Sequence, residues 1–164
     1  MPSESKARRK PAATPPTPKR AGGTSLAARL GITATSAVQR IALPPTVAAA
    51  LGKSGRDAAT ASGIPPDIIV CAVSDSADIV RHAPGVAQAY RAGGRLWMLY
   101  PKRAGRIRTD ISRDHGWQPL LERGFVPVAQ LAVNEDWSAL RFRLAAEVRS
   151  LTRKTAIGAG VPRR

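Results

Sequence analysis

Two apolar runs decide the fold of this 164-residue chain, and they are Asp67-Ile-Ile-Val-Cys-Ala-Val73 and Arg95-Leu-Trp-Met-Leu-Tyr100. Each run is short and rich in large or β-branched apolar side chains. Each follows residues that interrupt regular structure, Pro65-Pro66 and Gly93-Gly94. Continuous apolar runs of this length predict strands buried on both faces, and such strands belong to parallel sheets covered by helices. We therefore expect an α/β sheet.

Helices and further strands are predicted around these two runs. Ser74-Asp75-Ser76 can cap a helix that extends to about Ala92, and Pro84-Gly85 should break or kink that helix. The segment 53–64 has no clear pattern, and the segment from 145 to about 156 has the pattern of a basic helix. The other expected elements are helices at 26–30, 46–51 and 114–123 and strands at 37–43, 126–133 and 139–144.

The last two strands are joined by only a few residues, which is too short for a crossover helix. They must therefore form an antiparallel hairpin. Alternation of strands and helices before this hairpin indicates parallel strands. The sequence thus predicts a small, mostly parallel Rossmann-like sheet that ends in an antiparallel hairpin, and this order resembles the C-terminal half of the methyltransferase fold.

Three motifs resemble those of a widespread bacterial family of unknown function. They are Gly94-Arg-Leu-Trp-Met-Leu-Tyr-Pro-Lys102, Arg108-Thr-Asp110 and Asp136-Trp-Ser-Ala-Leu-Arg141. The family has a glycine-led strand ending in Pro-Lys, a Thr-Asp helix start and a Trp-Ser element before the final strand. The resemblance covers about residues 25–145 in the order of elements. It implies a methyltransferase-like fold without an assigned activity.

The positive charge of the chain is concentrated at its ends. The chain has 26 Lys and Arg against 11 Asp and Glu, a formal net charge of +15. Residues 25–147 account for only +5 of this charge. We expect a disordered, proline-rich basic tail over 1–23, one α/β methyltransferase-like domain over 24–147, and a basic C-terminal helix and tail over 148–164.

Composition excludes several classes of protein. The single Cys71 excludes a disulfide framework and a multi-cysteine zinc site, and it fits a reducing cytoplasm. No second ligand accompanies His82 or His115 at metal spacing. No apolar run approaches the ~20 residues that span a bilayer, and no apolar segment follows the basic N-terminus. We expect a cytoplasmic protein without a membrane contact or a metal, and the oligomeric state stays open.

The first predicted strand ends without a nucleotide-binding turn. A methyltransferase would place a glycine-rich turn there, so that backbone N–H groups could approach S-adenosylmethionine. This chain has Ala42-Leu-Pro-Pro45 instead, and prolines carry no N–H group. We expect no cofactor, and we assign no catalytic residue.

The loop 101–110 follows a buried strand and contains four basic residues, Lys102, Arg103, Arg106 and Arg108. Arginine binds phosphate and carboxylate in a bidentate manner, which predicts an anion site on the rim of the sheet. In the alternative interpretation, the loop is merely solvated and Arg106 or Arg108 pairs with Asp110 or Asp114. Basic residues of the N-terminal tail are the other candidate contacts: Arg8, Arg9, Lys10, Lys19 and Arg20.

A possible ligand rim combines two further segments, and its members are Ser74, Asp75, Asp136, Trp137 and Ser138. The carboxyl ends of parallel strands are where open α/β sheets place ligands. Ser74 or Asp75 can equally cap the next helix. An exposed Trp137 could stack on a base, whereas a buried one would fill the gap beside the turn.

The leading hypothesis is a non-enzymatic module that binds a polyanion, above all nucleic acid, through the tails and the loop. Lys and Arg are plentiful while no base-reading motif is present, which predicts contacts to the backbone rather than to bases. A second hypothesis is a nucleotide- or S-adenosylmethionine-like binding protein or enzyme that uses the rim. A third is a scaffold with solubilising tails.

Overall fold

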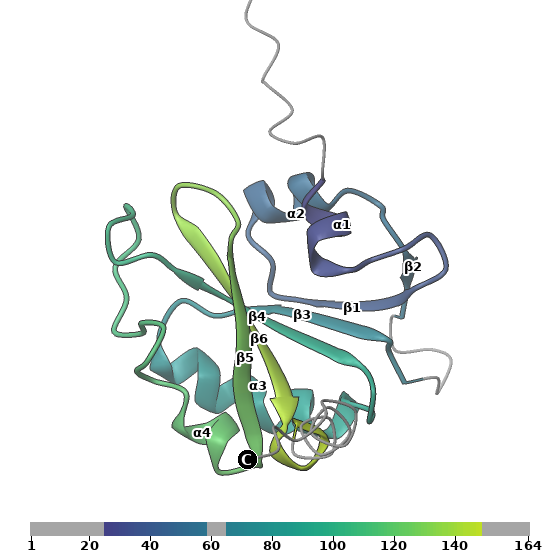
Figure 1. The fold of residues 1–164 in the computed structure, drawn as a ribbon. Helices are drawn as coiled ribbons and strands as arrows, with labels where there is room; N and C mark the ends of the chain where they lie inside the picture. Colours follow the sequence, from purple (N-terminus) through teal and green to yellow (C-terminus); the bar gives the residue numbers. More distant parts are fainter. Residues whose placement is uncertain (1–24, 59–64, 149–164) are drawn as a thin grey trace, which may run out of the picture.

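The computed structural model of the chain describes residues 25–58 and 65–148. Figure 1 shows a twisted sheet with helices on both sides. The helices are α1 (Leu26–Leu30), α2 (Pro45–Leu51), α3 (Ser76–Ala89) and α4 (Gln118–Leu121). The strands are β1 (Ala37–Ile41), β2 (Arg56–Asp57), β3 (Ile68–Ala72), β4 (Arg95–Pro101), β5 (Phe125–Ala132) and β6 (Trp137–Leu144).

The six strands lie in the order β2-β1-β3-β4-β6-β5. Strands β1 to β4 are parallel, whereas β6 is antiparallel to both of its neighbours, β4 and β5. The predicted mostly parallel sheet ending in an antiparallel hairpin is confirmed. A last strand inserted antiparallel between two others is the methyltransferase-like arrangement.

Strands β3 and β4 form the centre of the sheet. All five residues of β3 are buried, and so are all residues of β4 after Arg95. Both strands follow the predicted apolar runs, because only residues without polar side chains can fill both faces of a covered strand. Trp97 lies in the core as expected, and its indole N–H donates to the Leu30 carbonyl at 2.9 Å.

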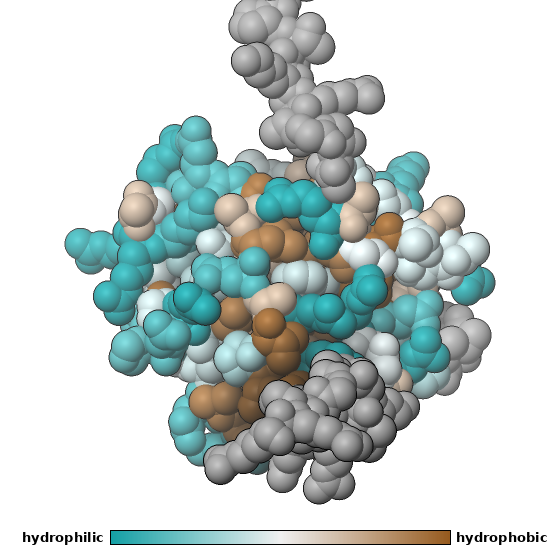
Figure 2. Space-filling view, viewed as in Figure 1, coloured by the Kyte–Doolittle hydropathy of each residue, from teal (hydrophilic) through white to brown (hydrophobic). Residues whose placement is uncertain are grey.

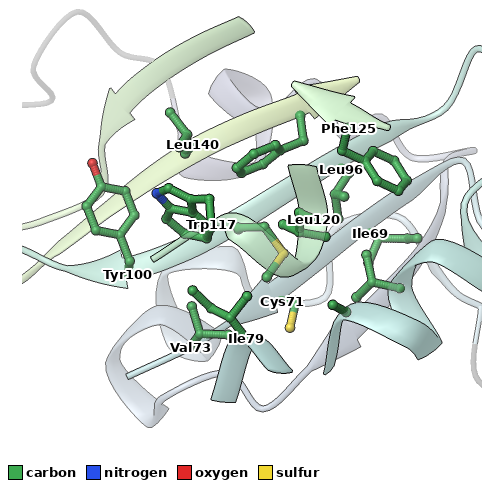
Figure 3. Close-up of a cluster of buried hydrophobic side chains, with 14 of the residues drawn as sticks. Ile69, Cys71, Val73, Ile79, Leu96, Tyr100, Trp117, Leu120, Phe125 and Leu140 are labelled. Carbon is green, nitrogen blue, oxygen red and sulfur yellow. The ribbon is translucent and has the colours of Figure 1, made fainter. Parts of the chain in front are cut away.

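Two apolar layers hold the helices to the sheet. One contains Ile79 and Val86 of α3 with Leu120 of α4, packed against β3, β4 and β6. Figure 3 shows part of this layer, with Cys71 among its smaller members. The other layer packs Leu30 of α1 and helix α2 against the opposite face. Helices α1 and α2 therefore cover one face and α3 and α4 the other (Figure 1).

The predicted break in the third helix is wrong. Helix α3 continues through Pro84 to Ala89, short of the expected Ala92. Proline removes only one N–H group from the helical ladder. The buried side chains of Ile79, Ala83 and Val86 lie on both sides of that position and pack into one cluster. This packing holds the helix across the missing bond.

The predicted helix 114–123 is too long, since α4 has only four residues. Pro119 is the second residue of α4, and proline fits a helix only in its first turn. The preceding residues form a turn in which Ser112 and His115 exchange backbone hydrogen bonds at 3.2 and 3.4 Å. The indole N–H of Trp117 then closes this turn by donating to the Ser112 carbonyl at 2.8 Å.

The remaining predictions concern the first elements of the chain, the segment 53–64 and the two ends of the chain. Helix α1 has the predicted bounds, α2 begins one residue earlier than predicted, at Pro45, and β1 ends two residues earlier than predicted, at Ile41. Strand β2 occupies part of the segment 53–64 that had no clear pattern, and it pairs in parallel with β1. Residues 145–148 are helical, and the rest of the expected C-terminal helix lies outside the described residues. The basic tail 1–23 lies outside them as well.

Candidate functional site

The carboxyl ends of β1, β3 and β4 meet along one edge of the sheet, where α/β proteins place their ligands. The segment after β1 lacks the glycine-rich turn that a nucleotide would approach closely. It passes through Ala42, whose φ is 53°, and enters α2 at Pro45 with Pro44 as the N-cap. The two consecutive prolines remove two of the N–H groups that a phosphate or carboxylate could bind at the start of α2.

The segment after β3 has its donors occupied by carboxylates of the chain itself. Asp75 caps α3 by accepting from the Asp78 N–H at 2.9 Å, and Asp78 accepts from the Ser74 N–H at 2.9 Å. Asp110 accepts from the Ser76 N–H at 2.8 Å and from the Ser76 hydroxyl. These bonds from the Ser76 hydroxyl and N–H lower the pKa of Asp110. The capping interpretation of Asp75 is thus confirmed.

The carboxylates at the start of α3 make this part of the rim unfavourable for an anionic ligand. A helix N-terminus attracts an anionic group through its free N–H groups and its dipole. At α3, Asp75, Asp78 and Asp110 already supply that negative charge. An incoming phosphate would therefore meet like charge rather than open donors.

The loop 101–110 is fixed at both ends. At its start, the Lys102 N–H donates to the Asp136 carbonyl at 2.8 Å, and the Arg106 N–H donates to the Asp136 carboxylate at 3.1 Å. Gly105 lies against the Asp136 backbone, where an added Cβ would come within 3.1 Å of its Cα. At its end, Asp110 anchors the loop to α3. The loop therefore has a defined shape on the rim, although it contains no regular structure beyond β4.

The four basic side chains of the loop have different surroundings. Arg106 lies 3.7 Å from both Glu135 and Asp136, so its ion-pair partners differ from the expected Asp110 and Asp114. Arg103 and Arg108 are exposed and form no ion pair within residues 25–58 and 65–148. Lys102 is half-buried. Two basic groups are thus presented to solvent on a fixed loop.

The surface around the loop is open rather than pocketed. One hollow of about 620 Å³ is lined by Asp75, Ser76, Arg108 and Asp110, together with Ala77 and Thr109 between them. In Figure 1 the loop after β4 projects at the left of the molecule, and hydrophilic side chains cover that margin in Figure 2. An exposed surface of this kind can contact an extended partner, but it does not enclose a small ligand.

The members of the predicted ligand rim differ in their exposure to solvent. Asp75 is exposed and Asp136 is half-buried beside the loop. Trp137 and Ser138 are each only 5% exposed, so these two side chains are not available to a ligand. Trp137 packs into the layer below α1 and α2, which confirms the structural interpretation of this tryptophan. Ser74 is half-buried, and its N–H is bound by Asp78.

Sequence reasoning missed a second group of basic residues, Arg95, Arg141 and Arg143. Arg141 and Arg143 alternate with apolar residues along β6, which places both on the same face of the sheet. The alternation was visible in the sequence. Arg95 could not be assigned to this group from the sequence, because its proximity depends on the pairing of β6 with β4.

Other kinds of site have no basis in the described part of the chain. No group of three or more His, Cys, Asp or Glu side chains there could hold a metal ion. None of its helices has the length and apolar content needed to cross a bilayer. Burial raises the pKa of the Cys71 thiol to about 12, with a smaller contribution from Asp78. This thiol is therefore protonated at neutral pH and is a poor nucleophile.

The fold defines the class of protein, a Rossmann-like α/β domain with methyltransferase-like topology. No protein-family model matches the chain, and no curated protein matches it. Among solved structures it is similar to a candidate methyltransferase of Thermoplasma acidophilum, at 8% identity and a TM-score of 0.42, over 69% of this chain and 70% of that one. A candidate tRNA methyltransferase of Streptococcus pneumoniae gives 14% identity and a TM-score of 0.39, over 75% and 74%. Likenesses this distant do not transfer a function.

Proposed function

We propose that this chain is a non-enzymatic α/β module that binds the backbone of a nucleic acid. The contacts are made by the basic loop 101–110 and by the basic tails. We also propose that it works in the cytoplasm and belongs to the bacterial family of unknown function that its motifs resemble.

One observation carries the proposal: Arg103 and Arg108 are exposed on a loop that Asp110 and Asp136 hold in place. A guanidinium group on a fixed loop loses less freedom on binding than one on a mobile segment. The guanidinium group can donate two parallel hydrogen bonds to the oxygen atoms of one phosphate. The tails add further positive charge to the chain, because residues 1–24 and 149–164 hold eleven basic residues against Glu4.

The same rim argues against the small-molecule alternative. The turn after β1 has prolines in place of glycines, and the start of α3 is occupied by carboxylates. At the start of α3, S-adenosylmethionine or a nucleotide would compete with Asp75, Asp78 and Asp110 for the N–H groups that these carboxylates bind. The open surface fits a polymer better than a small ligand.

The test is a titration of a fluorescein-labelled duplex DNA and a labelled RNA strand with the full chain at low salt. We expect binding that weakens steeply as salt is added, because each phosphate contact releases condensed counterions. Removal of residues 1–23 together with Lys102→Gln, Arg103→Gln and Arg108→Gln should weaken it strongly. Absence of binding by the full chain at low salt overturns the proposal. Specific thermal stabilisation by S-adenosylmethionine or a nucleotide would favour the alternative instead.

A further inference from the structure

Three arginines form a patch on one face of the sheet, and we call Arg95, Arg141 and Arg143 the arginine patch. In the β4–β6 register Leu96 pairs with Phe142 and Trp97 with Arg141, so one step further along Arg95 lies opposite Arg143. Opposite residues of antiparallel strands have Cα atoms about 4.5–5.5 Å apart. Arg141 follows on the same face of β6 at about 7 Å from Arg143. Like charges in this arrangement repel one another.

The described residues do not neutralise this patch. The Nε atoms of Arg141 and Arg143 are buried and have no hydrogen-bond partner among the described residues. Arg95 donates from its guanidinium to the Gly31 carbonyl at 3.1 Å, and none of the three arginines forms an ion pair within residues 25–58 and 65–148. Burial lowers the pKa of Arg141, and the charges of Arg95 and Arg143 lower it further. Repulsion between these charges and their partial burial therefore lower the stability of the folded state.

One acid, Glu147, lies close enough to act on the patch electrostatically. Its carboxylate is already engaged by three donors, namely the Gly93 N–H at 2.6 Å, the Tyr90 hydroxyl at 2.7 Å and the Leu144 N–H at 3.1 Å. Glu147 forms no ion pair at the patch within the described residues. Its charge therefore only partly offsets that of the three arginines.

The remainder of the chain cannot supply the missing negative charge. Outside the described residues, its only acid is Glu4, against eleven basic residues. A second copy of the chain placed symmetrically over the patch would bring three more arginines. Charge complementarity therefore requires a different molecule that is strongly anionic.

We propose that the arginine patch is a second binding surface for the phosphate backbone of a nucleic acid. This inference rests on the proposed function and adds a surface that the basic loop does not include. Arg141 and Arg143 recur at a spacing comparable to that of successive phosphates along a nucleic-acid strand. All three side chains are half-buried, so each is partly held by the protein and partly exposed to solvent.

The distance between the arginine patch and the basic loop determines how long a nucleic acid must be to contact both. Arg95 begins β4 and the basic loop follows its end, and a strand of seven residues is about 20 Å long. A nucleic acid that contacts both surfaces must therefore span about this distance. In the sequence, five further basic residues follow Arg143, and the first of them is Arg149.

The test compares two pairs of substitutions that remove the same charge. Arg141→Gln with Arg143→Gln alters the patch, whereas Arg81→Gln with Arg123→Gln alters exposed arginines on and after the helices of the opposite face. Binding of labelled RNA and labelled duplex DNA is measured by fluorescence anisotropy at one salt concentration. We expect the patch pair to raise the Kd about tenfold or more, because two charge-assisted contacts are lost. The control pair should change the Kd less than about threefold.

The outcomes separate this inference from the proposed function. Equal weakening by both pairs overturns the patch and leaves the proposed function intact, whereas no binding by the full chain overturns both. If polyglutamate competes as well as nucleic acid, the partner is an acidic protein and the assignment is wrong. Because the patch pair could disturb folding, the Nε–H signals of Arg141 and Arg143 are also followed by NMR in the unaltered chain. They should shift when RNA is added, and unchanged signals under saturating RNA refute the patch.

Discussion

Replacement of Arg141 by methionine should make the folded domain more stable. Methionine has a similar length without the charge, so it fills the same space on β6. The substitution removes repulsion from Arg95 and Arg143, which is of the order of 0.2–1 kcal/mol for like charges on neighbouring strands. It also removes a buried Nε without a partner. Because part of the guanidinium is in solvent, screening reduces the electrostatic share, and we expect a net gain of about 0.5–1 kcal/mol.

The gain is measured as the free energy of unfolding in urea and as the melting temperature. About 1 kcal/mol corresponds to about 3–5 °C for a domain of this size. The difference should shrink at about 1 M salt, where the Debye length is about 3 Å. The control Arg123→Met alters an exposed arginine after α4 and should stay within about 0.5 kcal/mol of the unaltered chain. A loss of more than about 1 kcal/mol in Arg141→Met would show that this guanidinium has an internal partner, which contradicts the account of the arginine patch.

Three further predictions concern the fold around the rim. Trp97→Phe leaves the Leu30 carbonyl without its buried donor, so the free energy of unfolding in urea should fall by about 1–3 kcal/mol; an unchanged value contradicts the packing of α1 on the sheet. Native Cys71 should resist a thiol reagent at pH 8 and react only as the chain unfolds, because burial raises its pKa to about 12; rapid labelling would place it at the surface. The lowered pKa of Asp110 means that its bonds to Ser76 stabilise the fold above the pKa of the unfolded chain and are lost as the pH falls through the folded pKa. Asp110→Asn should therefore flatten the acid limb of a plot of stability against pH, and an identical limb in both chains refutes the anchor.

The sequence was sufficient for the central strands because their signal is local. An apolar run such as 67–73 has one stable environment, a strand covered on both faces, and neighbouring breakers fix its ends. Proline was harder to interpret, since its effect depends on packing. Pro84 stays inside α3 because buried neighbours hold that helix, whereas Pro119 fixes the start of α4.

The candidate site was less predictable because it depends on contacts between distant residues. Asp110 and Ser76 are 34 positions apart, and the Asp110 carboxylate binds the Ser76 N–H at the start of α3. The pairing of Arg106 with Glu135 and Asp136 likewise depends on where the hairpin tip lies. Composition identified the basic loop, but only the folded chain shows which of its charges are free within the described residues.

The most direct test of the central claim is the dependence of nucleic-acid binding on salt. The logarithm of the binding constant for duplex DNA is plotted against the logarithm of the salt concentration, for the full chain and for Lys102→Gln, Arg103→Gln and Arg108→Gln combined. On duplex DNA each phosphate contact contributes about 0.9 to the slope, so the loop variant, which lacks three positive charges, should have a slope shallower by about 2.7. Equal slopes in both proteins, or binding that ignores salt, would contradict the account.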